Sequence, residues 1–154
     1  MESSVNQHQQ NLSAIIHLST FSKYFIPFGN FILPLVLWSS NKKDSAFVDA
    51  NGKNAINFQI SLLLYSIALG IISVPLFFHF SMDIFNVFDL AEHNTHEFKI
   101  DNWRDVRGNF LLILVILLFS LGLFLLDIFS TVMATIKANK GEVYNYRFAI
   151  NFIK

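Results

Sequence analysis

Long apolar stretches that are almost free of charge constrain this chain more than any other feature. Residues 54–82 contain no Asp, Glu, Lys or Arg, and residues 108–136 contain only one such residue, Asp127. Each stretch exceeds the roughly 20 helical residues that cross a bilayer core about 30 Å thick. Their apolar bodies, at about 56–80 and 108–136, leave no face for water. The sequence therefore predicts two full transmembrane helices.

Composition supports the membrane class and excludes several others. Only 14% of the residues are charged, against about 25% in an average soluble domain. The absence of cysteine excludes disulfide scaffolds and thiolate metal sites. A formal net charge of zero argues against a nucleic-acid partner, which requires a basic surface. We expect an all-α polytopic membrane protein surrounded by a lipid bilayer.

A third hydrophobic segment, at about 13–38, is interrupted. Proline lacks a backbone donor and glycine loosens the chain, so the helix is expected to break in this segment. The residues assigned to the break are Pro27, Gly29, Asn30 and Pro34. Each half is too short to span a bilayer, which leaves either one kinked or broken span or a re-entrant hairpin with both ends on one side. The kinked span is favoured.

This reading divides the chain into a polar N-terminal tail at 1–12, a transmembrane domain at 13–140 and an interfacial C-terminal tail at 141–154. Most of the basic residues lie in the first loop and near the C-terminus. They are Lys42, Lys43, Lys53, Lys137, Lys140, Arg147 and Lys154. Basic loops stay in the cytoplasm, so we expect a multi-pass protein of the bacterial inner membrane with a cytoplasmic C-terminus. The side of the N-terminus depends on the kinked-span or hairpin alternative.

The second loop and the C-terminal tail carry weaker signals. The loop is acidic, with Asp83, Asp89, Glu92, Glu97, Asp101 and Asp105. A solvated interfacial turn explains these charges better than an ion or partner site. His93 and His96 lack the spacing of a metal motif, so no metal or cofactor is expected. The aromatic and basic tail is expected to lie among lipid headgroups, with partner binding as the alternative.

Asp127 is the most informative single residue. It lies ten residues before Lys137, about 15 Å along a helix, which places it near the middle of the membrane. A carboxylate there must be paired, protonated or facing water. Lys23 is the only charge in the first segment and is the preferred partner. Hydrogen bonds to Ser120 or Thr131, and an ion or proton pathway, are the alternatives.

Further polar residues are expected to hold the helices together. His17 is expected to be a satisfied hydrogen-bonding residue rather than a ligand. Asn54, Asn57 and Ser61 share one helical face, which could satisfy the broken backbone of the first segment. Gln59 is likewise suited to helix–helix contacts. Residues 47–52 are expected to form a loop with a turn at Asn51-Gly52.

Three patches of the sequence together resemble a known family. They are residues 17–19 with 26–38, residues 45–61, and residues 136–146. They resemble a bacterial family of small membrane proteins of unknown function, which is similar to the twenty-kilodalton subunit of the chloroplast inner-envelope protein import translocon. The family often has His-Gly-Lys-Glu at 51–54 and Tyr-Pro at 146–147, where this chain differs. The resemblance implies a helical membrane protein linked to protein translocation or membrane-protein assembly.

No nucleophile–base constellation or phosphate-binding loop is recognisable, so we do not expect an enzyme. The favoured function is a non-enzymatic accessory subunit of a membrane complex, for translocation or insertion of proteins. Its partners would be other membrane subunits or further copies of itself, contacted through Asp127 and the polar face. The alternative is a small oligomeric channel or carrier that uses Lys23 and Asp127.

Overall fold

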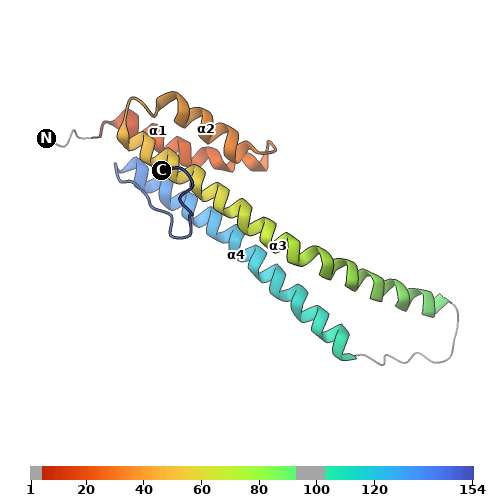
Figure 1. Ribbon diagram of the computed structural model, residues 1–154. Coiled ribbons are helices and arrows are strands. Elements are labelled where there is room, and N and C mark those ends of the chain that lie inside the picture. Colours follow the sequence, from red (N-terminus) through yellow and green to blue (C-terminus); the bar gives the residue numbers. More distant parts are fainter. Residues whose placement is uncertain (1–4, 93–102) are drawn as a thin grey trace. The chain divides into compact units, whose positions relative to one another are not determined.

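The computed structural model describes residues 5–92 and 103–154, without the side chains of 79–80, 82–92, 103–107 and 109. All regular structure within these residues is helical (Figure 1), which confirms the all-α prediction. The elements are α1 (Gln7–Leu18), the 3-10 helix η1 (Ser19–Tyr24), α2 (Gly29–Asn41), α3 (Ala46–Glu92) and α4 (Trp103–Asn139). By length and composition, two segments could cross a membrane, Ala46–Phe78 and Phe110–Asn139.

The chain divides into two compact units. Unit 1 consists of Met1–Leu64 and Phe124–Lys154, and unit 2 of Tyr65–Leu123. Helices α3 and α4 contribute residues to both. In unit 2, large apolar side chains such as Ile71, Phe77 and Phe119 are each more than 60% exposed. Exposed apolar helices of this length suit contact with lipid rather than water.

The first hydrophobic segment is broken, as predicted, but its two halves fold back into a hairpin. Helices α1 and α2 contact each other and lie side by side in Figure 1, so the favoured kinked span is not observed. The chain reverses just before α2, where Phe28 adopts a left-handed conformation with φ of 59°. Gly29 is required beside it, because a Cβ would lie 2.8 Å from the carbonyl carbon of Ser22.

The break lies earlier in the segment than the sequence indicated. The α-helix ends at Leu18, the chain continues as η1 and then as turns at 25–28, and Asn30 and Pro34 lie inside α2. At the other end of the hairpin, α1 begins at Gln7, within the stretch assigned to the polar tail. Asn6 and Gln9 form a capping box there, each side chain bonding the other's backbone N–H.

The start of α3 corrects a second expectation. Residues 47–52, predicted to be a loop, belong to the helix, which begins at Ala46. The hydroxyl of Ser45 accepts a bond from the backbone N–H of Val48 at 3.4 Å, as an N-cap residue does. Gly52 is a packing residue rather than a turn residue, because a Cβ would lie 2.2 Å from Cδ1 of Trp38.

An apolar cluster in unit 1 joins the hairpin to the start of α3. Its buried members come from α1, α2 and α3. They are Ile16, Trp38, Val48, Ala55 and Ile56. The indole nitrogen of Trp38 donates to Oδ1 of Asp49 at 2.9 Å, so the buried ring leaves no polar atom unpaired. This cluster fixes the hairpin against α3 and so positions the polar groups described next.

Candidate functional site

A chain of polar side chains links η1, α2, α3 and α4 around Asp127. Nζ of Lys23 in η1 donates to Oδ2 of Asp127 in α4. Nε2 of Gln59 in α3 donates to the other carboxylate oxygen at 3.2 Å. Nδ2 of Asn30 in α2 donates to Oε1 of Gln59 at 2.8 Å. These four residues, called the Asp127 network, tie the hairpin to both long helices.

The burial of the Asp127 network determines what it can do. Asp127 is 3% exposed, whereas the side chain of Lys23 is 24% exposed. A buried carboxylate is tolerated when it is paired and hydrogen-bonded, and both oxygens of Asp127 are engaged. The predicted pairing with Lys23 is confirmed. The alternative partners are not used, since Ser120 donates to the carbonyl of Ile116 and the partners of Asp127 are Lys23 and Gln59.

A second buried cluster surrounds His17. Its Nε2 lies 3.0 Å from Oδ1 of Asn51, and its Nδ1 lies 2.9 Å from the hydroxyl of Tyr146. Nδ2 of Asn51 donates to the carbonyl of Phe47 at 3.0 Å, which fixes the amide orientation. Oδ1 of Asn51 must therefore accept, so His17 carries its proton on Nε2 and accepts from Tyr146 at Nδ1. His17, Asn51 and Tyr146 form the His17 network.

Burial keeps this imidazole neutral. His17 lies outside both candidate spans, and loss of hydration lowers its pKa to about 4, although the bond to Asn51 opposes the shift. Burial also raises the pKa of the Tyr146 hydroxyl well above its usual value. The ring of Tyr146 stacks on Phe58, with centroids 4.1 Å apart. The expectation that His17 is a satisfied hydrogen-bonding residue is confirmed.

The C-terminal tail is held by the polar face of α3. Nδ2 of Asn54 donates to the carbonyl of Tyr144 at 2.9 Å. Asn57 binds the backbone of Ile153 in both directions, donating at 3.0 Å and accepting at 2.9 Å. The hydroxyl of Ser61 accepts from the N–H of Ile150 at 2.8 Å. Side chains of α3 thus satisfy backbone groups of a tail that has no regular structure of its own.

This docking changes the role expected for the polar face. Asn54, Asn57 and Ser61 do share a face, but they satisfy the tail rather than the broken first segment. Among the predicted contact residues of α3, Gln59 is the one that reaches that segment, through Asn30. The side chains of Phe148, Ile150 and Phe152 remain 44–58% exposed, so the outer side of the tail is still apolar.

Two residues of the site were missed in the sequence. Asn51 was assigned to a turn and Tyr146 to the membrane interface, yet both are buried around His17. A signal for Asn51 was present: it precedes Asn54 by three residues, so a helix extended upstream carries it on the polar face. No local signal marks Tyr146, because its burial depends on where the tail docks.

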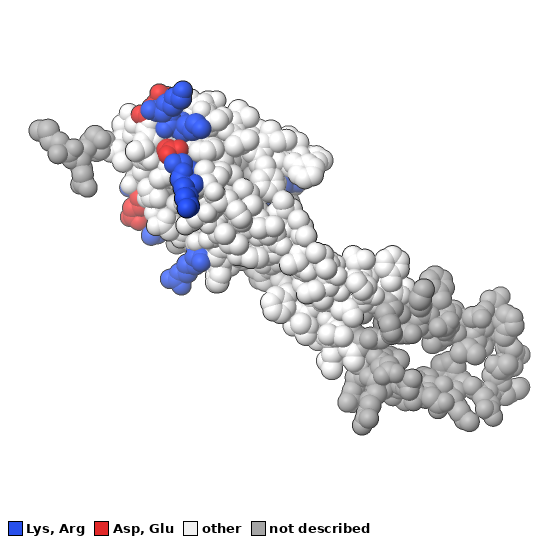
Figure 2. Space-filling view, in the orientation of Figure 1, with Lys and Arg blue, Asp and Glu red and all other residues white. Residues whose placement is uncertain are grey.

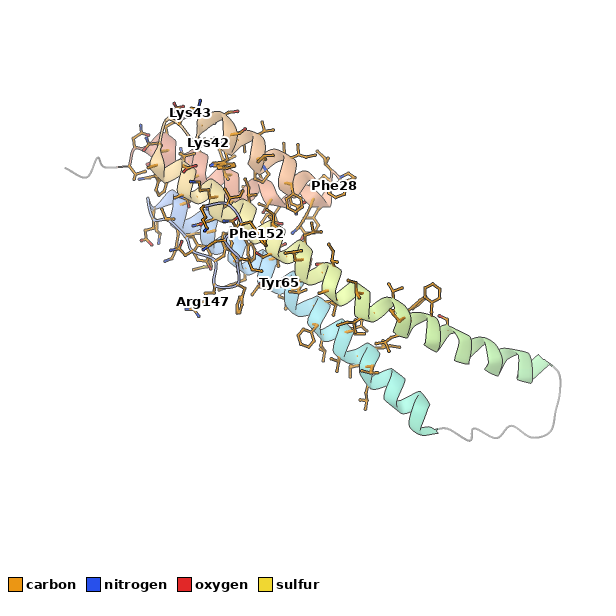
Figure 3. All side chains as sticks on the ribbon, viewed as in Figure 1. Phe28, Lys42, Lys43, Tyr65, Arg147 and Phe152 are labelled. Carbon is orange, nitrogen blue, oxygen red and sulfur yellow. The ribbon has the colours of Figure 1, made fainter. Side chains whose placement is uncertain are left out.

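Charged groups of unit 1 gather where α2 leads into α3 (Figure 2). Lys42 and Lys43, labelled in Figure 3, follow α2, and the Lys42 ammonium lies 4.6 Å from the Trp38 ring centre. Lys53 pairs with Asp49 at 2.6 Å. The predicted acidic and histidine features of the second loop lie outside the residues or side chains that the structure describes.

Within unit 1, the start of α1 approaches the residues that follow α4. A Cβ on Gly141, just after α4, would lie 3.1 Å from Nε2 of Gln10 and 4.0 Å from Cβ of Val5. Nε2 of Gln10 also donates to the carbonyl of Val5 at 3.1 Å. The start of α1 is therefore next to the end of α4, as the hairpin arrangement requires.

Comparison with known proteins gives one match. The model of the magnetosome magnetite crystal formation protein family matches residues 8–153. Searches of characterised proteins and of solved structures each found no match. The family match overturns the resemblance to the chloroplast import subunit. The patches behind that resemblance have structural roles here, since Gly141, with φ of 81°, ends α4, and residues 51–57 hold His17 and the tail.

Proposed function

Because the chain belongs to the magnetosome magnetite crystal formation protein family, we propose that it is an integral protein of a magnetite-forming membrane compartment. The family match carries this proposal, since it extends over nearly all of both units. Two helices of spanning length and apolar composition support residence in the bilayer. Protein translocation has no support from the family and is not retained.

We propose that the chain acts on crystal formation without catalysis of its own. The buried polar groups that could have done chemistry are used internally, since both oxygens of Asp127 and both ring nitrogens of His17 have protein partners. The same observation gives a carrier mechanism through Lys23 and Asp127 no support. Unit 1 is best suited to a fixed scaffold that anchors the chain and contacts neighbouring membrane proteins.

The acidic stretch at 83–105, which the sequence assigned to the second loop and which includes the end of α3 and the start of α4, is the segment we propose to meet the mineral. Carboxylate oxygens and imidazole nitrogens are common iron ligands, and the sequence at 83–105 supplies both. The distribution of basic residues assigns the first loop and the tail to the cytoplasm, and hence the second loop to the opposite side. We propose that this opposite side faces the growing crystal.

Replacement of a family member tests the proposal. The chain is expressed in a magnetite-forming bacterium that lacks its own member, and crystal lengths are measured by electron microscopy. We expect the chain in the membrane of the magnetite vesicles and crystal lengths shifted toward those of the parent strain. A matched pair of variants replaces either the acids of 83–105 or the exposed lysines Lys42 and Lys43 by amides. Normal amounts of the chain in the vesicles, with crystal lengths unchanged from those of the strain that lacks the family member, would refute a role in crystal formation.

A further inference from the structure

An open groove with a volume of about 620 Å³ lies in unit 1 between α4 and the C-terminal tail. The wall from α4 is formed by one helical stripe, and the wall from the tail by residues 143–145, 147 and 148. The α4 stripe consists of Leu126, Phe129, Ser130, Met133 and Lys137. This groove is separate from the Asp127 and His17 networks, whose side chains do not line it.

The groove has two chemically different ends. Met133, Phe129 and Leu126 lie about one, two and three helical turns before Lys137, so the apolar end extends roughly 16 Å from the basic end. Lys137 and Arg147 provide the basic end. Figure 3 labels Arg147 on the tail that forms one wall of the groove.

The basic end can accept an anion. The ammonium of Lys137 lies 3.4 Å from Glu142, but both side chains are more than 40% exposed, so this pair is weak and replaceable. Among the described residues, no ion pair involves Arg147. Asn145 adds a neutral donor, because its amide oxygen accepts from Asn54 and its NH₂ group is left to bind elsewhere.

The position of the groove along α4 identifies its occupant. The candidate span of α4 ends at Asn139, so Lys137 belongs to its last turn. A basic residue at the end of an apolar span is expected at the depth of lipid headgroups. The apolar end then lies at the depth of acyl chains, where Phe129 is 67% exposed. We propose that the groove binds an anionic phospholipid, with its phosphate between Lys137 and Arg147 and an acyl chain along Met133, Phe129 and Leu126. This inference requires membrane residence but not a role in magnetite formation.

A membrane-level groove favours lipid over a soluble anion. A small phosphate compound would use the two cations and leave the apolar end empty. A phospholipid fills both ends, and basic pockets at this level of a membrane protein are typical headgroup sites. We therefore expect the affinity of the groove for a lipid to depend on the charge of the headgroup and on the length of the acyl chain.

Native mass spectrometry of the full chain in a mild detergent tests both dependences. Phosphatidylglycerol is titrated against phosphatidylcholine with the same acyl chains, and then against a short-chain phosphatidylglycerol. We expect the long-chain anionic lipid to bind at least about tenfold more tightly than either comparison lipid. Equal retention of phosphatidylglycerol and phosphatidylcholine would overturn the proposal.

Two matched variants locate the site. The double variant Lys137→Gln/Arg147→Gln is expected to lose that selectivity, whereas Lys42→Gln/Lys43→Gln, which removes two exposed lysines elsewhere in unit 1, should keep it. A similar loss of lipid selectivity in both variants would indicate a general effect of charge and would refute the proposed site. Displacement by millimolar inorganic phosphate would show a soluble-anion site instead. If the first variant fails to fold, the lipid comparison on the unaltered chain still decides the question.

Discussion

Replacing Asp127 with alanine should destabilise unit 1 by about 3 kcal/mol. Removing one partner of a buried ion pair costs about 3–5 kcal/mol, because the remaining charge is buried without compensation. Lys23 retains 24% exposure of its side chain and can recover part of its hydration, which favours the lower end of that range. The loss of the bond from Gln59, whose Nε2 then has no acceptor at Asp127, is included in this figure.

The assay is reversible unfolding in mixed micelles, followed by the fluorescence of buried Trp38 in a Trp103→Phe background. A double variant, Lys23→Met/Asp127→Leu, provides the control, since replacing both charges with apolar groups of similar size is often nearly neutral. We expect it to lie within about 1 kcal/mol of the parent chain. A double variant as unstable as Asp127→Ala, or a negligible effect of Asp127→Ala, would refute the view that the pair acts as a unit.

Three further predictions follow from the packing of unit 1. Gly52→Ala should destabilise the protein by about 1–3 kcal/mol, because the new Cβ would overlap the Trp38 ring. Gly70→Ala is the control, since Gly70 has open space around it and the change should not destabilise the protein. Thermal unfolding of the two variants measures the difference. The pKa of His17 is lowered from 6.5 to about 4 in the folded chain. As the pH falls below 6.5, the unfolded chain therefore binds a proton at His17 before the folded chain does. The free energy of unfolding should decline by up to about 3 kcal/mol between pH 6.5 and pH 4. Denaturation curves of a His17→Phe variant should lack that component, and an identical pH slope in both chains would contradict the assignment. Asn57→Ala removes three bonds to the tail and should raise amide hydrogen exchange at Phe152 and Ile153 at least about tenfold; unchanged protection would show that the tail is held elsewhere.

Some of this fold could be predicted from the sequence because its signals are local. Apolar length identified the two long helices, and Pro27 with Gly29 located the break in the first segment. The pairing of Lys23 with Asp127 was predictable because each is isolated in an apolar stretch and a buried charge requires a partner.

Other features depend on contacts between distant residues. A helix break indicates where the chain departs from a helix, but the reversal at Phe28 follows from its left-handed conformation and from the approach of Gly29 to Ser22. Asn51-Gly52 has the composition of a turn, yet Gly52 is helical because Trp38, fourteen positions earlier, packs on it.

The functional interpretation failed for a related reason. The short patches that resembled an import subunit contain residues that cap α4, bind His17 and hold the tail. Such structural requirements do not specify a function. Only the comparison over residues 8–153 identified the family.

We propose that the α1–α2 hairpin keeps positions 7 and 142 on the same side of a membrane that only α3 and α4 cross. The chain has no cysteine, so single cysteines can be labelled in intact cells with an impermeant maleimide. The test positions are Gln7 and Glu142, both exposed, with Asn94 in the second loop as the opposite-side control. The account predicts that cysteines at 7 and 142 react from the same side, and that a cysteine at 94 reacts from the other. Labelling of position 7 together with position 94 would mean that the first segment crosses the membrane and would contradict the account.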